Sequence, residues 1–304
     1  MFYIGAWDKQ KIITHYLEHN PSVNGVVVFY REGLQREYDI PVKCEYLEYK
    51  QSIKYTNYYR LLEHVNRNTL IIVDECLGTS NCHCLEYNCM KTILNQTPQR
   101  LVFNYLPFID SVDDFMILME FYNDVRYKGE AFDWNFLKDI NLHVKPVHVK
   151  IEFERMDLPE KSIEKYTRER EKLFNNAVND VEINPDTIHR QLALLAGNLR
   201  FNSLPEEKRG LINDCLVRNN RFKMGVTYKD CMKTYPECDE IKVFDFPTYK
   251  KHLLDVLNVL KVDKIHVFTS DLRVDDLYYR QTWEKWVNEL EEFYQKFAEI
   301  KNAN

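Results

Sequence analysis

The sequence predicts an α/β protein built on a parallel sheet with helices on both faces. Short runs of branched apolar residues, at 26–30 and 70–73, lack the polar alternation of a half-exposed strand, which is typical of strands buried on both faces. Segments with helical spacing of apolar residues lie between these runs. Strands that alternate with helices along a chain form parallel sheets.

The composition is that of a folded chain with room for a full core. The 304 residues include 20 Tyr and 17 Phe but only 8 Gly and 10 Pro, which excludes a low-complexity chain. The net charge of −6 provides no overall basic field for nucleic acid. The sequence has no apolar run of membrane-spanning length and no signal-peptide layout at its N-terminus, so we expect a soluble, intracellular protein with no membrane partner.

In the first half, apolar runs and helical spacing alternate from the N-terminus onward. Turn signals at 20–21 and 24–25 separate the first helix from the second strand. We predict strands at 2–6, 26–30, 44–49, 70–73 and 100–105, and helices at 8–19, 58–65, 84–94 and 112–122.

The second half has weaker periodicity. We predict strands at 147–153, 242–246 and 264–270. We predict helices at 161–176, 186–197, from 204–209 through Leu216, at 248–260, and over most of 271–304.

The strand at 70–73 runs straight into Asp74 and Glu75. The carboxyl edge of an open parallel sheet is where α/β proteins place ligands. In nucleotide hydrolases, an Asp at this place holds magnesium and a neighbouring Glu polarises the attacking water. The alternative is a strand end with two solvated carboxylates.

Asp74-Glu75-Cys76 is followed by a polar stretch, a segment containing Met90-Lys91-Thr92, an Arg-led strand at 99–110 and an acidic-apolar segment at 112–118. This order resembles the first RecA-like lobe of superfamily-two helicases, of the P-loop NTPase type, and above all the Swi/Snf-type DNA translocases. That family has an Asp-Glu-Ala-His motif, a helix, an Arg-led strand ending in a Thr-Gly-Thr-Pro-like motif, and an acidic-hydrophobic helix. Further likeness at 132–137, 147–153, 158–159 and 163–166 extends the resemblance over roughly residues 1–175.

The sequence departs from this family where nucleotide would bind. A phosphate loop needs glycines for backbone approach, a Lys for charge and a Ser or Thr for magnesium. Here Gly5 and Lys9 remain, but Trp7 and Asp8 occupy the cradle and Gln10 replaces the hydroxyl. An aspartate at that place would repel phosphate.

Two further motifs of the family are altered. The fourth residue of the Asp-Glu motif is Leu77, and the turn at 104–107 keeps only the proline. We therefore predict no catalytic residues, no ATP hydrolysis and no bound cofactor. The resemblance implies a vestigial nucleotide site made of Gly5, Lys9, Asp74 and Glu75.

The likeness to the second lobe of the family is partial. A helix and the strand at 264–270 resemble the opening of that lobe, but only 271–304 follow. We therefore predict a degenerate RecA-like lobe at 1–145, a mainly helical insertion or linker at 146–240, and a truncated strand-helix segment at 241–304.

Two surface features are candidates for binding. A local basic run of Arg218, Arg221 and Lys223 has the character of a nucleic-acid contact, with a solvated loop as the alternative. A stripe on the last helix is either core packing or a face for a protein partner. Its residues are Trp283, Trp286, Leu290, Phe293 and Phe297.

Four of the eight cysteines lie close together in the sequence. Zinc prefers paired ligands in two separated knuckles, and the spacing here fits that pattern only in part. We expect reduced thiols and no metal, although the sequence leaves a site open. The residues are Cys76, Cys82, Cys84 and Cys89.

Two functions follow from these observations. In the first, the chain is a catalytically inactive relic of a helicase-like ATPase, a pseudoenzyme that binds proteins in a larger assembly, and viral origin with a virion role is a hypothesis. In the second, it is a weak or partner-completed ATP-dependent nucleic-acid translocase, in which Asp74 and Glu75 hold magnesium and Lys9 contacts phosphate.

Overall fold

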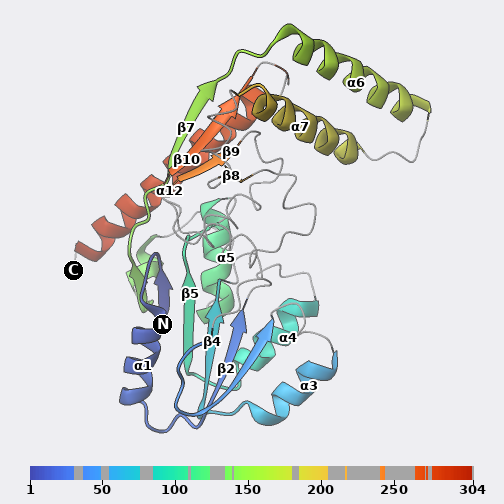
Figure 1. The fold of residues 1–304 in the computed structure, drawn as a ribbon. Helices are drawn as coiled ribbons and strands as arrows, with labels where there is room; N and C mark the ends of the chain where they lie inside the picture. The colour runs from blue at the N-terminus through green and yellow to red at the C-terminus, as the bar shows by residue number, and fades with distance from the viewer. Residues whose placement is uncertain are drawn as a thin grey trace. The chain divides into compact units, whose positions relative to one another are not determined.

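The structure is a computed structural model (Figure 1). It describes residues 1–30, 37–48, 55–75, 85–108, 111–123, 134–138, 140–179, 185–204, 216–217, 240–243, 264–270, 272 and 276–302. The chain divides into two compact units. The first contains Met1–Val147 and Glu289–Asn304, and the second contains His148–Asn288. In the described part of the chain, no helix is both long and apolar enough to span a membrane.

The first unit is built on a parallel sheet. Its described strands have the order β3-β2-β4-β5-β1-β6, and every adjacent pair is parallel. All six residues of β4 are buried, as the unbroken apolar run predicts. The strands are β1 (Phe2–Ile4), β2 (Gly25–Tyr30), β3 (Lys43–Glu48), β4 (Thr69–Asp74), β5 (Arg100–Asn104) and β6 (Leu142–Val144).

Helices cover both faces of this sheet. Ile13 of α1 packs with Val28, Ile72 and other residues of one face, together with partly buried Tyr3. On the opposite face, Phe2 lies edge-to-face against Tyr122 of α5, with ring centroids 5.8 Å apart. The predicted α/β class is confirmed. The helical elements are α1 (Lys9–His19), α3 (Tyr55–His64), α4 (Leu85–Leu94), α5 (Val112–Asn123) and the 3₁₀ helix η1 (Trp134–Lys138).

The strand order places a switch point between β1 and β5. The chain leaves β1 through α1 and reaches β2, on the far side of β5 and β4. It leaves β5 through α5 and reaches β6, on the far side of β1. Two neighbouring strands thus send their connections in opposite directions, and open α/β sheets bind ligands outside such a point.

The second unit contains another parallel sheet, with the strand order β7-β10-β9-β8 among the described residues. Helices α6 and α7 pack together through Tyr166, Ile188 and Leu192. Arg200 of α7 is buried and its Nε donates to Ser270 Oγ over 2.7 Å. The elements are β7 (Lys150–Arg155), β8 (Leu216–Val217), β9 (Glu240–Val243), β10 (Lys264–Thr269), α6 (Glu160–Asn179), α7 (Pro185–Asn202) and α12 (Asp276–Asn302), whose last part belongs to the first unit.

The structure corrects three details of the sequence predictions. Strand β6 and helix η1 were not predicted, because each is short and has no clear periodicity. Leu216, expected at the end of a helix, lies in strand β8. The three-part division at 145 and 240 stays a prediction, and β7, β9 and β10, from its second and third parts, share one sheet. The helix predicted at 248–260 lies outside the described residues.

The stripe on α12 is buried. The side chains of Trp283, Trp286, Leu290 and Phe293 are at most 2% exposed. The Phe293 ring contacts Phe115, with centroids 4.9 Å apart. Phe293 therefore packs in the core, which was the alternative to a partner face. The stripe is buried and is not proposed as a docking surface.

Candidate functional site

The site begins where β4 ends. Asp74 is the last residue of β4, and its neighbours on the strand alternate between the two faces, so its side chain lies on the α1 side with Leu70 and Ile72. Glu75 then turns the chain with a positive φ of 56°. A non-glycine residue in this conformation costs about 1–3 kcal/mol and needs its surroundings to hold it. The Glu75 N–H donates to the Phe103 carbonyl over 2.8 Å, which fixes the turn.

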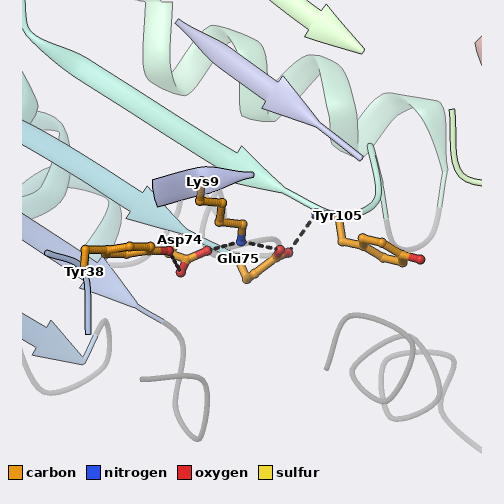
Figure 2. Close-up of polar contacts among 5 residues, drawn as sticks. All are labelled: Lys9, Tyr38, Asp74, Glu75 and Tyr105. Carbon is orange, nitrogen blue, oxygen red and sulfur yellow. Dashed lines mark hydrogen bonds and ion pairs between the residues drawn. The ribbon is translucent and has the colours of Figure 1, made fainter. Parts of the chain in front are cut away.

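Helix α1 brings Lys9 to the same place. Asp8 caps the helix, because its Oδ1 accepts the Lys11 N–H over 3.1 Å, and Lys9 is the first helical residue. The Lys9 ammonium donates to Asp74 and, over 2.8 Å, to Glu75 Oε1. Figure 2 shows the ammonium between the two carboxylates. Three of the four residues predicted for the vestigial site thus meet.

Every oxygen of the two carboxylates accepts a hydrogen bond from the protein. Lys9 donates to Asp74 Oδ1 and to Glu75 Oε1. The Tyr38 hydroxyl donates to Asp74 Oδ2 over 2.6 Å, and the Tyr105 N–H donates to Glu75 Oε2 over 2.9 Å (Figure 2). A magnesium ion at this place would have to share these oxygens with protein donors and lie beside the Lys9 ammonium.

The three charged residues are removed from solvent. Lys9 is 5% exposed, Asp74 1% and Glu75 2%. Burial disfavours the ammonium, but the charges and hydrogen bonds of the two carboxylates outweigh it and raise the pKa of Lys9. Lys9 is therefore charged at neutral pH, and it acts as a fixed cation between the acids.

The segment 37–40 brings the Tyr38 hydroxyl to Asp74. Gln10 holds this segment, since its side chain accepts the Asp39 N–H and donates to the Asp39 carbonyl, each over 2.9 Å. The Tyr46 hydroxyl accepts the Tyr38 N–H over 2.7 Å. These contacts position the Tyr38 hydroxyl on Asp74. The residue at the place of a magnesium-binding hydroxyl thus joins α1 to the 37–40 segment.

Gly5 has a structural reason to be glycine. Its φ is +110°, and a Cβ added there would lie 2.0 Å from the Lys145 carbonyl oxygen. The Lys145 N–H donates to the Ile4 carbonyl over 2.8 Å, so this close approach belongs to the pairing beside β6. Its presence is therefore explained without a phosphate.

Two N–H donors in and after the turn between β1 and α1 are bonded to acceptors of the same segment. The amide of Lys11 at the start of a helix would suit an anion, but the Asp8 carboxylate accepts it. The Trp7 indole N–H donates to the Ile4 carbonyl over 2.8 Å. An acidic cap at a helix N-terminus places negative charge where a phosphate oxygen would lie.

Several predicted site residues are not described by the structure. Arg218, Arg221 and Lys223 lie outside the described residues, as do Leu77 and three of the clustered cysteines, Cys76, Cys82 and Cys84. Cys89 is buried. Two residues of the site were not predicted from the sequence. Tyr38 belongs to no motif, and Tyr105 contributes its backbone N–H, which the residue type does not reveal.

Comparison with known proteins gives fold neighbours only. No protein-family model and no curated protein matches this sequence. Among solved structures, the chain is similar to the SWI2/SNF2 ATPase core of Sulfolobus solfataricus in complex with dsDNA, at 12% identity and a TM-score of 0.34, covering 88% of this chain and 83% of that one. It is also similar to the Hef helicase domain of Pyrococcus furiosus, at 10% identity and a TM-score of 0.42, covering 92% and 94%.

A structure of the SWI2/SNF2 ATPase core domain of Sulfolobus solfataricus gives nearly the same values, 12% identity, a TM-score of 0.35 and coverage of 89% of this chain and 81% of that one. Similarity at this distance does not determine a function, so we base the proposed function on the contacts in the site.

Proposed function

We propose that this chain is a catalytically inactive, helicase-like ATPase relic that serves as a binding or structural module of a larger assembly. The observation that supports it is the closed network around Asp74 and Glu75. Magnesium and water would need carboxylate oxygens that are open to them. Here protein donors occupy all four oxygens, and Lys9 is the cation between them.

The turn at the start of α1 supports the same proposal. A phosphate that approached this turn would meet the Asp8 carboxylate on the Lys11 amide. It would also find the Lys9 ammonium buried and engaged with two acids. Of the groups that a phosphate loop would supply, the Lys11 amide and the Lys9 ammonium are engaged within the protein, and Gln10 replaces the hydroxyl. In this proposal, Lys9, Asp74 and Glu75 bind one another in place of a nucleotide and magnesium.

A rigid sheet without turnover suits a role in protein assembly, and we extend the proposal to protein partners inside a cell or virion. This extension predicts that affinity capture of the tagged full chain from its native source recovers a stable partner at a fixed ratio. Recovery of the free monomer alone would remove the assembly part of the proposal.

A second candidate function is a weak or partner-completed ATP-dependent nucleic-acid translocase. It is favoured by one observation: Lys9, Asp74 and Glu75 meet outside the switch point of the sheet, which is where α/β proteins bind nucleotides. In this case a nucleotide would draw Lys9 away from the acids, which would release them for magnesium.

Calorimetry with ATP and magnesium on the purified full chain separates the two. We expect no binding heat at about 1 mM nucleotide, which corresponds to a standard binding free energy weaker than about −4 kcal/mol. Binding that Lys9→Met abolishes and that Lys11→Met leaves intact would overturn the relic proposal. Lys11 is a matched control because it is exposed on the same turn of α1.

Turnover gives an independent measurement. A phosphate-release assay with the wild type and Glu75→Gln would give equal background rates if the chain is inactive. A rate that falls in the Glu75→Gln variant would support the translocase. Repeating the assay with double-stranded DNA tests whether nucleic acid activates the chain.

A further inference from the structure

Helix α1 carries a second group of polar residues, on the side that faces solvent. His15, Glu18 and His19 are spaced by three and four residues, so they lie on one face of the helix. All three are exposed, whereas Ile13 of the same helix is buried in the core. One ligand atom from each lies within 4.8 Å of the others.

A hydrogen bond orients one of the imidazoles. His19 Nδ1 lies 2.8 Å from the backbone carbonyl oxygen of His15. A carbonyl oxygen only accepts, so Nδ1 carries the proton, and the lone pair of the neutral ring is on Nε2. Histidines that bind metals are oriented in this way by a carbonyl or carboxylate on the other nitrogen. The His15 and His19 rings lie close, with centroids 4.1 Å apart.

The place on the helix suits a cation. His19 is the last residue of α1, where the helix dipole is negative. The Glu18 carboxylate adds a negative charge beside the two imidazoles. Two imidazole nitrogens and one carboxylate oxygen form a ligand set typical of zinc that keeps an open position.

We propose that His15, Glu18 and His19 bind a divalent transition-metal ion of the zinc type on the outer face of α1. Zinc binds imidazole nitrogen at about 2.0–2.1 Å and carboxylate oxygen at about 2.0–2.2 Å. The three side chains are exposed, and their ligand atoms already lie within 4.8 Å of one another. The fourth position is open to water or to a group from outside.

The consequence of this site is local order in α1. The three ligands span the last two turns of the helix, so a bound ion links those turns to each other. The first turn of the same helix presents Lys9 to Asp74 and Glu75. Metal binding therefore stabilises the element on which the buried network depends, whichever function that network has.

Zinc titration of the full chain by calorimetry tests the proposal. The variant His15→Ala/His19→Ala is expected to bind one zinc fewer than the wild type. His64→Ala is the matched control, since His64 is exposed near the end of α3. Any zinc bound by the cysteine thiols is present in both proteins, so it cancels in the difference between the two stoichiometries. Equal stoichiometry in wild type and double variant would overturn the site.

A spectroscopic measurement identifies the ligands directly. In a chain with ¹⁵N-labelled histidine, zinc is expected to shift the ring nitrogens of His15 and His19 and to leave those of His64 unchanged. The Nε2 resonance of His19 should move most, because Nδ1 stays protonated. Shifts at His64 that equal those at His15 and His19 would mean non-specific binding and would also overturn the proposal.

Discussion

The ionic groups of the two units differ in depth. In the first unit, Lys9, Asp74 and Glu75 are at most 5% exposed at the end of a fully buried strand. In the second unit, Glu152 of β7 contacts Lys150 over 2.6 Å and Lys264 over 3.0 Å. Those side chains are 34% to 71% exposed. The distances within the ion pairs are similar in the two units, but the side chains of the second unit are far more exposed to solvent.

Depth decides what each set of charges can do. Exposed ion pairs are screened by water and salt, and they contribute little to folding. A buried charge that loses its partner costs several kcal/mol, because it remains desolvated. The network at β4 is therefore a set of interdependent residues, while the pairs on β7 are separable. We make five predictions, from the largest expected effect to the smallest, and four of them concern this difference.

Replacing Lys9 by Met should have the largest effect. It leaves two carboxylates buried without their cation, and breaking such a group typically destabilises by about 3–5 kcal/mol. Denaturant unfolding at pH 7 measures the loss against Lys11→Met, which changes an exposed lysine of the same helix. The triple variant Lys9→Met/Asp74→Asn/Glu75→Gln should recover much of it. Equal midpoints for the two single variants would mean that the network is not buried.

The Lys9 effect should also depend on pH. The folded pKa of Lys9 is raised, so its contribution is complete below the ordinary lysine pKa of about 10.4. It is lost as pH rises through the higher folded value. The stability difference between wild type and Lys9→Met should stay constant from pH 7 to about 10 and shrink above that.

Tyr38→Phe should have the next effect. It removes the hydroxyl that donates to Asp74 Oδ2, and a hydrogen bond to a charged group contributes about 1.5–3 kcal/mol. Combining it with Asp74→Asn in a double-mutant cycle isolates the contact. Additive losses in that cycle would show that Tyr38 and Asp74 are uncoupled.

Gly5→Ala should destabilise through the backbone. The residue has a φ of +110°, and its added Cβ would meet the Lys145 carbonyl at 2.0 Å. We expect a loss of about 1–3 kcal/mol in denaturant unfolding, the range for strained backbone. Gly25→Ala is the control, because a Cβ there lies 3.9 Å from the nearest atom, the Lys43 carbonyl oxygen. A control that loses as much as Gly5→Ala would contradict this explanation.

The ion pairs of β7 should show the smallest effect. Hydrogen bonds from Lys150 and Lys264 lower the pKa of Glu152 to about 2. Its contribution is present above the unfolded pKa of about 4.3, and it is lost as pH falls toward 2. Carboxyl NMR at low salt should give the lowered pKa, and about 1 M salt should move it back toward 4.3. A Glu152 pKa that does not change with salt would mean that these pairs are as removed from solvent as the Lys9–Asp74–Glu75 network.

Most of the first unit could be predicted from the sequence. Strands β2, β4 and β5 are unbroken apolar runs, and such runs depend little on distant residues. Helix α5 was predicted at 112–122 and begins at Val112. Strands β1 and β6 are three residues each, and the position of β6 beside β1 depends on pairing across the whole unit.

The site was predictable only in part. Gly5, Lys9, Asp74 and Glu75 follow recognisable motifs, and Lys9 does meet the acids. The closure of the site could not be predicted, because it depends on a tyrosine 36 positions away from Asp74 and on a backbone amide. The reason for Gly5 also lies in a distant contact, with Lys145.

Gln10 opposes the substitutions that would restore a phosphate loop at the start of α1. A phosphate loop needs Ser or Thr at this position, and either would break both hydrogen bonds to Asp39. Such a change loosens the segment that places Tyr38 before it supplies any nucleotide contact. Asp8 and Trp7 would still have to change. If the chain is the relic that we propose, a lineage that moved toward ATP binding one substitution at a time would lose stability first, so the change would be close to a one-way evolutionary step.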